Sequence, residues 1–194
     1  MLAVATRNGE FVTILTQIKT RRKYMNKKVH YLTEAAMIAA LYVLLTYLSS
    51  VLGLSSGAVQ LRFSEALCIL PLFTPAAVPG LFLGCLLSNL LTTAVIWDIL
   101  FGSLATLLGA LGTFALRRRS VYLAPIPPIL ANTLIVPAII CAMEGQWSLA
   151  LYLSFAATVF LGELISCFVF GLLLHRTCKR YAGALFKGTG GISK

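Results

Sequence analysis

The sequence has few charged residues, and this scarcity bounds its class. Only 11% of its 194 residues are Asp, Glu, Lys or Arg, and six are acidic, whereas a soluble domain carries about 25% charged residues. Hydrophobic residues make up 59% of the chain, and the mean hydropathy is +0.90. The apolar residues fall in blocks of about 20, the length of a helix that crosses a bilayer. The composition excludes a soluble domain and indicates an integral membrane protein.

Residue patterns of common enzyme classes are also missing. The two histidines, His30 and His175, lie at the ends of apolar blocks, so neither a buried Ser/His pair nor an HExxH zinc site can form. No GxxxxGK[ST] phosphate loop occurs, and the C-terminal "GTGGISK" has the wrong order. The five cysteines occur singly, without CxxC or Cys/His spacing. We therefore expect no catalytic residue, no metal site and no cofactor.

The positive charge is gathered in three clusters. The chain carries a net charge of +10, and most of its Lys and Arg residues lie in residues 19–28, 117–119 and 176–187. Basic islands between apolar blocks mark the cytoplasmic side of a membrane protein. This pattern accounts for the charge by membrane topology, and we expect no nucleic-acid partner.

Six apolar stretches predict an all-α bundle of six transmembrane helices. With six crossings, all three basic clusters lie on the cytoplasmic side, and so do both termini. The second stretch is too short to cross ~30 Å as one α-helix, so it either borrows residues from the preceding loop or is partly re-entrant. The stretches cover residues 32–52, 64–74, 77–96, 99–116, 121–143 and 148–175.

The chain divides into a membrane domain and two flanking segments. Residues 1–29 are polar, and we expect a cytoplasmic N-terminal extension for which Met25 is an alternative start residue. Residues 30–178 form the predicted six-helix membrane domain, and residues 179–194 form a cytoplasmic tail.

Small residues spaced four apart mark faces on which helix backbones approach closely. Gly80, Gly84 and Ser88 form such a series in the third stretch, and we expect them to pack within the bundle. The first stretch has two adjacent alanine stripes, which can hold either a neighbouring helix or a helix of a partner protein. These stripes comprise Ala35, Ala36, Ala39 and Ala40.

All seven prolines lie in or beside the apolar stretches. Proline interrupts helical hydrogen bonding, and irregular backbone at membrane depth is tolerated only inside protein or beside a cavity. We therefore expect the corner between the second and third stretches, and the fifth stretch, to border a cavity.

Polar residues within or beside the apolar stretches are the candidates for a binding site, because ionisable groups in a membrane are costly and usually functional. Glu163 lies deep in the sixth stretch and is the strongest candidate. The others lie near the middle of a stretch or at an outer helix start. They are Arg62, Glu65, Asn89, Trp97, Asp98 and Asn132.

Most of these candidates also have a purely structural interpretation. Glu65 and Asp98 suit the first turn of a helix, where a carboxylate complements the helix dipole. Arg62 can pair with Glu65 across one turn, and Trp97 suits an anchor at the membrane interface. The two asparagines can join helices by hydrogen bonds.

Five segments together resemble the queuosine-precursor transporter (QueT) family. They are "VQLRFSEAL", "PGLFLGCLLSNL", "DILFGSLATLLGAL", "APIPPILANTLIV" and "GELISCFVFGLLL". The similarity covers about residues 30–178, and "RxSEAL" and "FGSLATL" are its most specific parts. Members of this family are substrate-binding S components of energy-coupling factor (ECF) importers in the bacterial plasma membrane.

The resemblance implies a non-catalytic subunit that captures a 7-deazaguanine, preQ1 or preQ0, from outside the cell. It also implies delivery by docking on a transmembrane T subunit that two ATPase subunits drive, with the alanine stripes of the first helix as the docking face. The loop that carries Gln60 and Arg62 corresponds to a loop that closes over the ligand. The polar groups available to the ligand are Gln60, Arg62, Glu65, Asn89, Asp98, Asn132 and Glu163, with Trp97 as a stacking group.

Three other functions stay open at this stage. The chain can be an S component for another vitamin-like small molecule. It can be a self-contained secondary transporter in which Glu163 carries protons. It can also be a membrane assembly subunit that binds no small molecule.

Overall fold

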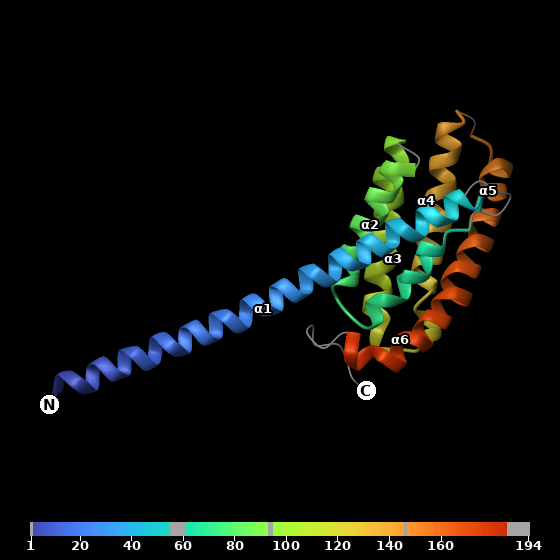
Figure 1. Cartoon of the computed structure of the whole chain (residues 1–194). Coiled ribbons are helices and arrows are strands. Elements are labelled where there is room, and N and C mark those ends of the chain that lie inside the picture. The colour runs from blue at the N-terminus through green and yellow to red at the C-terminus, as the bar shows by residue number, and fades with distance from the viewer. Residues whose placement is uncertain (1, 55–60, 93–94, 146, 186–194) are drawn as a thin grey trace.

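The computed structural model describes residues 2–54, 61–92, 95–145 and 147–185, with side chains described from residue 27 to residue 181 within these ranges. All regular elements in the described part of the chain are helical (Figure 1). The α-helices are α1 (Leu2–Val51), α2 (Ala77–Thr92), α3 (Ser103–Ala115), α4 (Ile126–Met143), α5 (Leu149–Glu163) and α6 (Gly171–Leu185). Between them lie the 3-10 helices η1 (Phe63–Leu72), η3 (Leu116–Arg118) and η4 (Val121–Leu123), and the π-helices η2 (Asp98–Gly102) and η5 (Leu164–Phe170).

Four helical stretches are long and apolar enough to cross a membrane. They run over Lys27–Val51, Asp98–Arg118, Val121–Met143 and Leu149–Tyr181. Two further apolar helices, η1 and α2, are shorter. Each of the six predicted stretches is thus largely helical, and the protein is a multi-pass membrane protein. The shortness predicted for the second stretch is confirmed, and α2 is also shorter than expected in the described residues.

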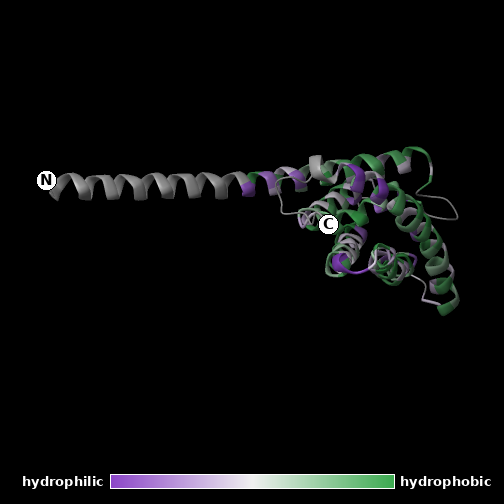
Figure 2. Cartoon of the chain, turned by 90° about the horizontal axis from the view of Figure 1, so that it is seen from below, coloured by the Kyte–Doolittle hydropathy of each residue, from purple (hydrophilic) through white to green (hydrophobic). Residues whose placement is uncertain are grey.

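Helix α3 has one apolar face turned outward and one face of small residues turned inward. In α3, Leu104, Leu108 and Leu111 are exposed, whereas Ala105 and Gly109 are buried. Large apolar side chains repeated every three or four residues on an outer face suit contact with lipid chains. Figure 2 views the bundle from below, and most of its helices are hydrophobic along their length.

Helix α1 packs on α2 through small residues, as the spacing of Gly80 and Gly84 predicts. A Cβ atom on Gly84 would lie 2.7 Å from the Cβ atom of Tyr42, and one on Gly80 would lie 2.8 Å from the carbonyl oxygen of Ala35. Such contacts require glycine, because real Cβ atoms do not approach this closely. This close approach places the buried Tyr42 side chain of α1 inside the bundle.

The second apolar stretch forms the 3-10 helix η1, which rises about 2.0 Å per residue instead of the 1.5 Å of an α-helix. Its residues from Ser64 to Pro71 are all buried. Helices α1, α2, α3 and α6 and the π-helix η5 contact it. Therefore η1 is enclosed by protein and presents little surface to lipid.

Both π-helices are continuous with neighbouring α-helices. The helix η2 leads directly into α3, and η5 joins α5 to α6 without a break. A π segment widens a helix and often accompanies a functional site. Irregular backbone of this kind is tolerated in a membrane beside a cavity, and the cavity is described below.

Helix α6 and the outlying part of α1 both lie toward the lower end of the view in Figure 1. Helix α1 is continuous from Leu2, so the described residues 2–29 of the segment that we expected as an extension run directly into the first apolar stretch. The prediction that both termini are cytoplasmic stays a prediction.

Candidate functional site

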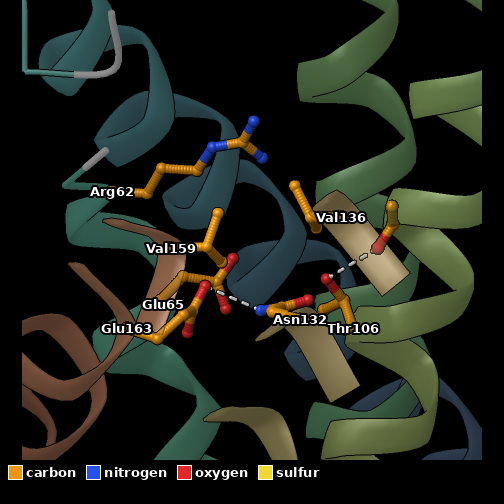
Figure 3. A pocket seen from close by; sticks show the side chains of 8 residues that line it. Arg62, Glu65, Thr106, Asn132, Val136, Val159 and Glu163 are labelled. Carbon is orange, nitrogen blue, oxygen red and sulfur yellow. Dashed lines mark hydrogen bonds between the residues drawn. The ribbon is translucent and has the colours of Figure 1, made fainter. Parts of the chain in front are cut away.

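A small pocket lies between four parts of the bundle (Figure 3). Its lining comes from the start of η1, the junction of η2 and α3, the middle of α4 and the end of α5. The lining residues are Arg62, Glu65, Gly102, Thr106, Asn132, Val136, Val159 and Glu163. Four of the predicted site residues therefore line the same pocket, although the first and the last are 101 positions apart in the sequence. They are Arg62, Glu65, Asn132 and Glu163.

An amide and a carboxylate lie side by side in the pocket lining. The side-chain nitrogen of Asn132 on α4 donates a hydrogen bond of 2.8 Å to Oε1 of Glu163 at the end of α5. Both side chains are buried, and Figure 3 shows their polar ends inside the pocket. The pair offers an N–H donor beside carboxylate acceptors, and this combination can read a flat heterocycle that carries both donors and acceptors.

The second carboxylate is held by α1. The Tyr42 hydroxyl donates a hydrogen bond of 2.5 Å to Oε1 of Glu65, and the Cys68 thiol donates one of 3.2 Å to Oε2. Glu65 is 2% exposed, and Tyr42 is completely buried. A hydrogen-bonded carboxylate inside the bundle has a fixed orientation, which suits recognition of a ligand.

Two further hydrogen bonds fix the start of η1 against α1. Thr46 donates to the Ser64 hydroxyl at 2.8 Å, and the backbone N–H of Phe63 donates to the Ser49 hydroxyl at 2.9 Å. Tyr42, Thr46 and Ser49 share one face of α1, because they follow a spacing of four and three residues. This face therefore sets the position of Glu65 in the pocket.

The two pocket glutamates lie close together. The side chains of Glu65, Glu163 and Cys167 each offer one atom that could bind a metal ion, and these three atoms lie within 4.8 Å of one another. Cys167 donates a hydrogen bond of 3.2 Å to Oε2 of Glu163. A metal ion could bridge such a spacing, but each of the four carboxylate oxygens already accepts a hydrogen bond from a neutral protein group.

Arg62 does not pair with Glu65, although their spacing allowed it. Its guanidinium lies 4.0 Å from Oδ2 of Asp98 and 3.5 Å from Oδ1 of Asn89. Asn89 also donates to the backbone oxygen of Asp98 at 3.1 Å. Figure 3 shows the guanidinium pointing away from the two glutamates. Asp98 and Asn89 therefore contact the guanidinium of Arg62 and do not themselves line the pocket.

Sequence reasoning missed the remaining side chains of the pocket. Thr106 on α3 donates to the carbonyl oxygen of Gly102 at 3.2 Å, and Val136 and Val159 form apolar walls. Threonine and valine are common in membrane helices, so nothing in the sequence distinguishes these positions. Tyr42 lay in an apolar run and was missed for the same reason.

Trp97 lies away from the pocket, and Gln60 is not among the residues that the structure describes. Trp97 is 55% exposed and stacks on Phe101 with 6.0 Å between ring centroids, so it is not part of the pocket lining. This position suits the alternative interpretation as an interface anchor.

The alanine stripes of α1 have different surroundings. Ala35 and Ala39 are buried, and their carbonyl oxygens face Gly80 and Gly84 of α2. Ala36 and Ala40 are exposed. The first stripe therefore packs within this chain, and the second is available to another helix.

These features define a helical multi-pass membrane protein with a buried polar pocket enclosed by irregular helices. A family model described as "QueT transporter" matches residues 32–180. Because this match covers most of the chain, the protein belongs to the QueT transporter family, as the resemblance of its segments suggested.

One curated relative is the queuosine precursor transporter QueT of Lactococcus lactis subsp. cremoris (strain MG1363), which is 34% identical over 80 residues. The alignment covers 41% of this chain and 47% of that protein, so the chain matches about half the length of this relative. No solved structure matches the chain.

Proposed function

We propose that this protein is the substrate-binding S component of an ECF importer for a queuosine precursor, preQ1 or preQ0. Membership of the QueT transporter family and the printed function of the Lactococcus relative support the substrate class. The observation that carries the proposal is the buried pair formed by Asn132 and Glu163. The protein would lie in the bacterial plasma membrane, with both termini cytoplasmic.

The chemistry of the pocket suits a 7-deazaguanine. The ring has one edge with a carbonyl acceptor beside an N–H and an amino donor. The Glu163 carboxylate can accept from the two donors, while the amide nitrogen of Asn132, only 2.8 Å from that carboxylate, can donate to the carbonyl. Val136 and Val159 supply apolar surface for the ring faces.

Import would require partner subunits. The exposed alanines Ala36 and Ala40 on α1 form a flat strip on which a helix of a T subunit can pack closely. The chain contains no phosphate-binding loop of the GxxxxGK[ST] type, so two separate ATPase subunits would supply the energy.

A binding measurement tests the proposal directly. The purified full-length protein should be stabilised against heat by preQ1 or preQ0, and calorimetry should show one ligand per chain. Guanine and riboflavin serve as comparison ligands. A folded protein that responds to neither deazaguanine, but responds to another vitamin, would reassign the substrate and keep the class.

A proton-coupled secondary transporter is the second candidate, because two buried carboxylates lie close together in the pocket. This function predicts uptake into vesicles that contain only this chain, driven by a proton gradient. The S-component proposal predicts uptake only when the T and ATPase subunits and ATP are present.

A further inference from the structure

The charged side chains that line the pocket are two carboxylates and one guanidinium, and the guanidinium of Arg62 pairs with Asp98. The two carboxylates belong to Glu65 and Glu163, and each of these residues is at most 8% exposed. In the part of the chain that the structure describes, the ion pair within 4.0 Å joins Arg62 to Asp98, and neither pocket glutamate has a basic partner at that distance. The four groups that donate to the two glutamates, on Tyr42, Cys68, Asn132 and Cys167, are all neutral.

Two adjacent carboxylates without a directly paired cation are unfavourable in a buried site. Like charges oppose each other, and burial removes the water that would solvate them. Neutral donors offset part of this cost, but they do not cancel the charge. A positive group that enters the pocket would relieve the repulsion and form charge-assisted hydrogen bonds, which are stronger than neutral ones.

We propose that Glu65 is the counter-ion for a protonated amine on the ligand, so that the pocket selects a deazaguanine with an aminomethyl group (preQ1) over the nitrile (preQ0). This inference rests on the proposed function and adds to it the charge of the preferred substrate. The aminomethyl group is a primary amine and carries a positive charge at neutral pH, whereas the nitrile is uncharged. The two ligands share the same ring.

The hydrogen bonds suit the two carboxylates to different parts of the ligand. Glu163 lies beside the Asn132 amide, and together they match the mixed donor and acceptor edge of the ring. Glu65 has two donors, Tyr42 and Cys68, and neither of these lines the pocket. They hold Glu65 from behind and leave its remaining lone pairs for a group that only donates, such as an ammonium.

The test compares three ligands on the full-length protein by competition calorimetry: preQ1, preQ0 and N-acetylated preQ1, which keeps the aminomethyl carbon but has no charge. We expect preQ1 to bind at least about tenfold more tightly than either neutral ligand, the effect of one charge-assisted hydrogen bond. The variant Glu65→Gln should bring the affinity ratio of preQ1 to preQ0 close to one. Glu163→Gln should instead weaken both ligands together and preserve the ratio.

The outcomes separate this inference from the proposed function. Equal binding of all three ligands by the wild-type protein would overturn the inference and leave the proposed function standing. A preference for preQ1 that survives Glu65→Gln would overturn the role of Glu65. Absence of binding by folded wild-type protein would overturn the proposed function itself. If Glu65→Gln does not fold, the comparison of preQ1 with its acetylated form on wild-type protein tests whether the pocket recognises the charge of the ligand. The variant Glu65→Asp, which keeps the charge on a shorter side chain, then tests the residue. Unchanged preQ1 affinity in Glu65→Asp would overturn the role of Glu65.

Discussion

The hydroxyl of Tyr42 lies 2.5 Å from Oε1 of Glu65 and donates a hydrogen bond to it. Tyr42 belongs to α1, the helix with the exposed alanine strip, whereas Glu65 lines the pocket. This bond joins α1 directly to a carboxylate of the candidate binding site. A movement of α1 on docking would therefore reach the pocket through Tyr42.

The first prediction concerns this hydrogen bond. Tyr42→Phe keeps the ring packed and removes one donor from a buried carboxylate, which costs about 1–3 kcal/mol. We expect a lower melting temperature and about tenfold weaker preQ1 binding, measured by thermal unfolding and calorimetry. Tyr47→Phe, at a position 60% exposed on the same helix, is the matched control and should change neither quantity.

The second prediction concerns Asn132. Asn132→Ala removes the amide that donates to Glu163, and we expect ligand affinity to fall about 10- to 100-fold, because a buried acceptor loses its partner. Leu134→Ala, at an exposed position two residues further along α4, should leave affinity unchanged. Wild-type affinity in Asn132→Ala would show that the amide does not read the ligand.

The third prediction concerns the packing of α1 on α2. In Gly84→Ala the new methyl group would meet the Cβ atom of Tyr42 at 2.7 Å, so the two helices must separate. We expect a loss of about 1–3 kcal/mol in stability, together with weaker ligand binding, since Tyr42 shifts. The control Leu87→Ala lies on the exposed face of α2. Unchanged melting of Gly84→Ala would show that α1 is free to move away from α2.

The fourth prediction concerns the exposed alanine strip. Ala36→Leu adds bulk to the face that we assign to the T subunit, so ligand binding should be normal while ATP-driven uptake is lost. Ala39 lies about one turn from Ala36 but on the buried stripe. The variant Ala39→Leu should therefore destabilise the protein itself. Uptake by Ala36→Leu at the wild-type rate in a reconstituted complex would remove this strip from the docking face.

The sequence predicted the pocket in part, for a physical reason. Charged and amide side chains are costly in a membrane, so Glu163, Asn132, Glu65 and Arg62 were conspicuous, and they line the pocket together. The partner of Arg62 was not predictable in the same way. Glu65 lay one turn away in sequence, but the fold brings Asp98 within reach instead.

The contributions of α1 were harder to predict. Tyr42 is an ordinary residue in an apolar helix, and its role appears only when η1 packs beside it. The two alanine stripes have the same composition, and only the position of α2 determines that Ala35 and Ala39 are buried. Rotation of a helix about its axis depends on its neighbours, and the spacing of small residues alone does not specify it.

The enclosure of η1 has a consequence for the choice of experimental medium. Helices that face lipid tilt or shift when the acyl chains become longer or shorter, but residues 64–71 are buried in protein. The Glu65 side of the pocket is therefore insulated from the thickness of the surrounding bilayer. Ligand affinity should be the same in bilayers of short-chain and long-chain lipids, even where uptake, which depends on contacts of the outer helices, changes with them.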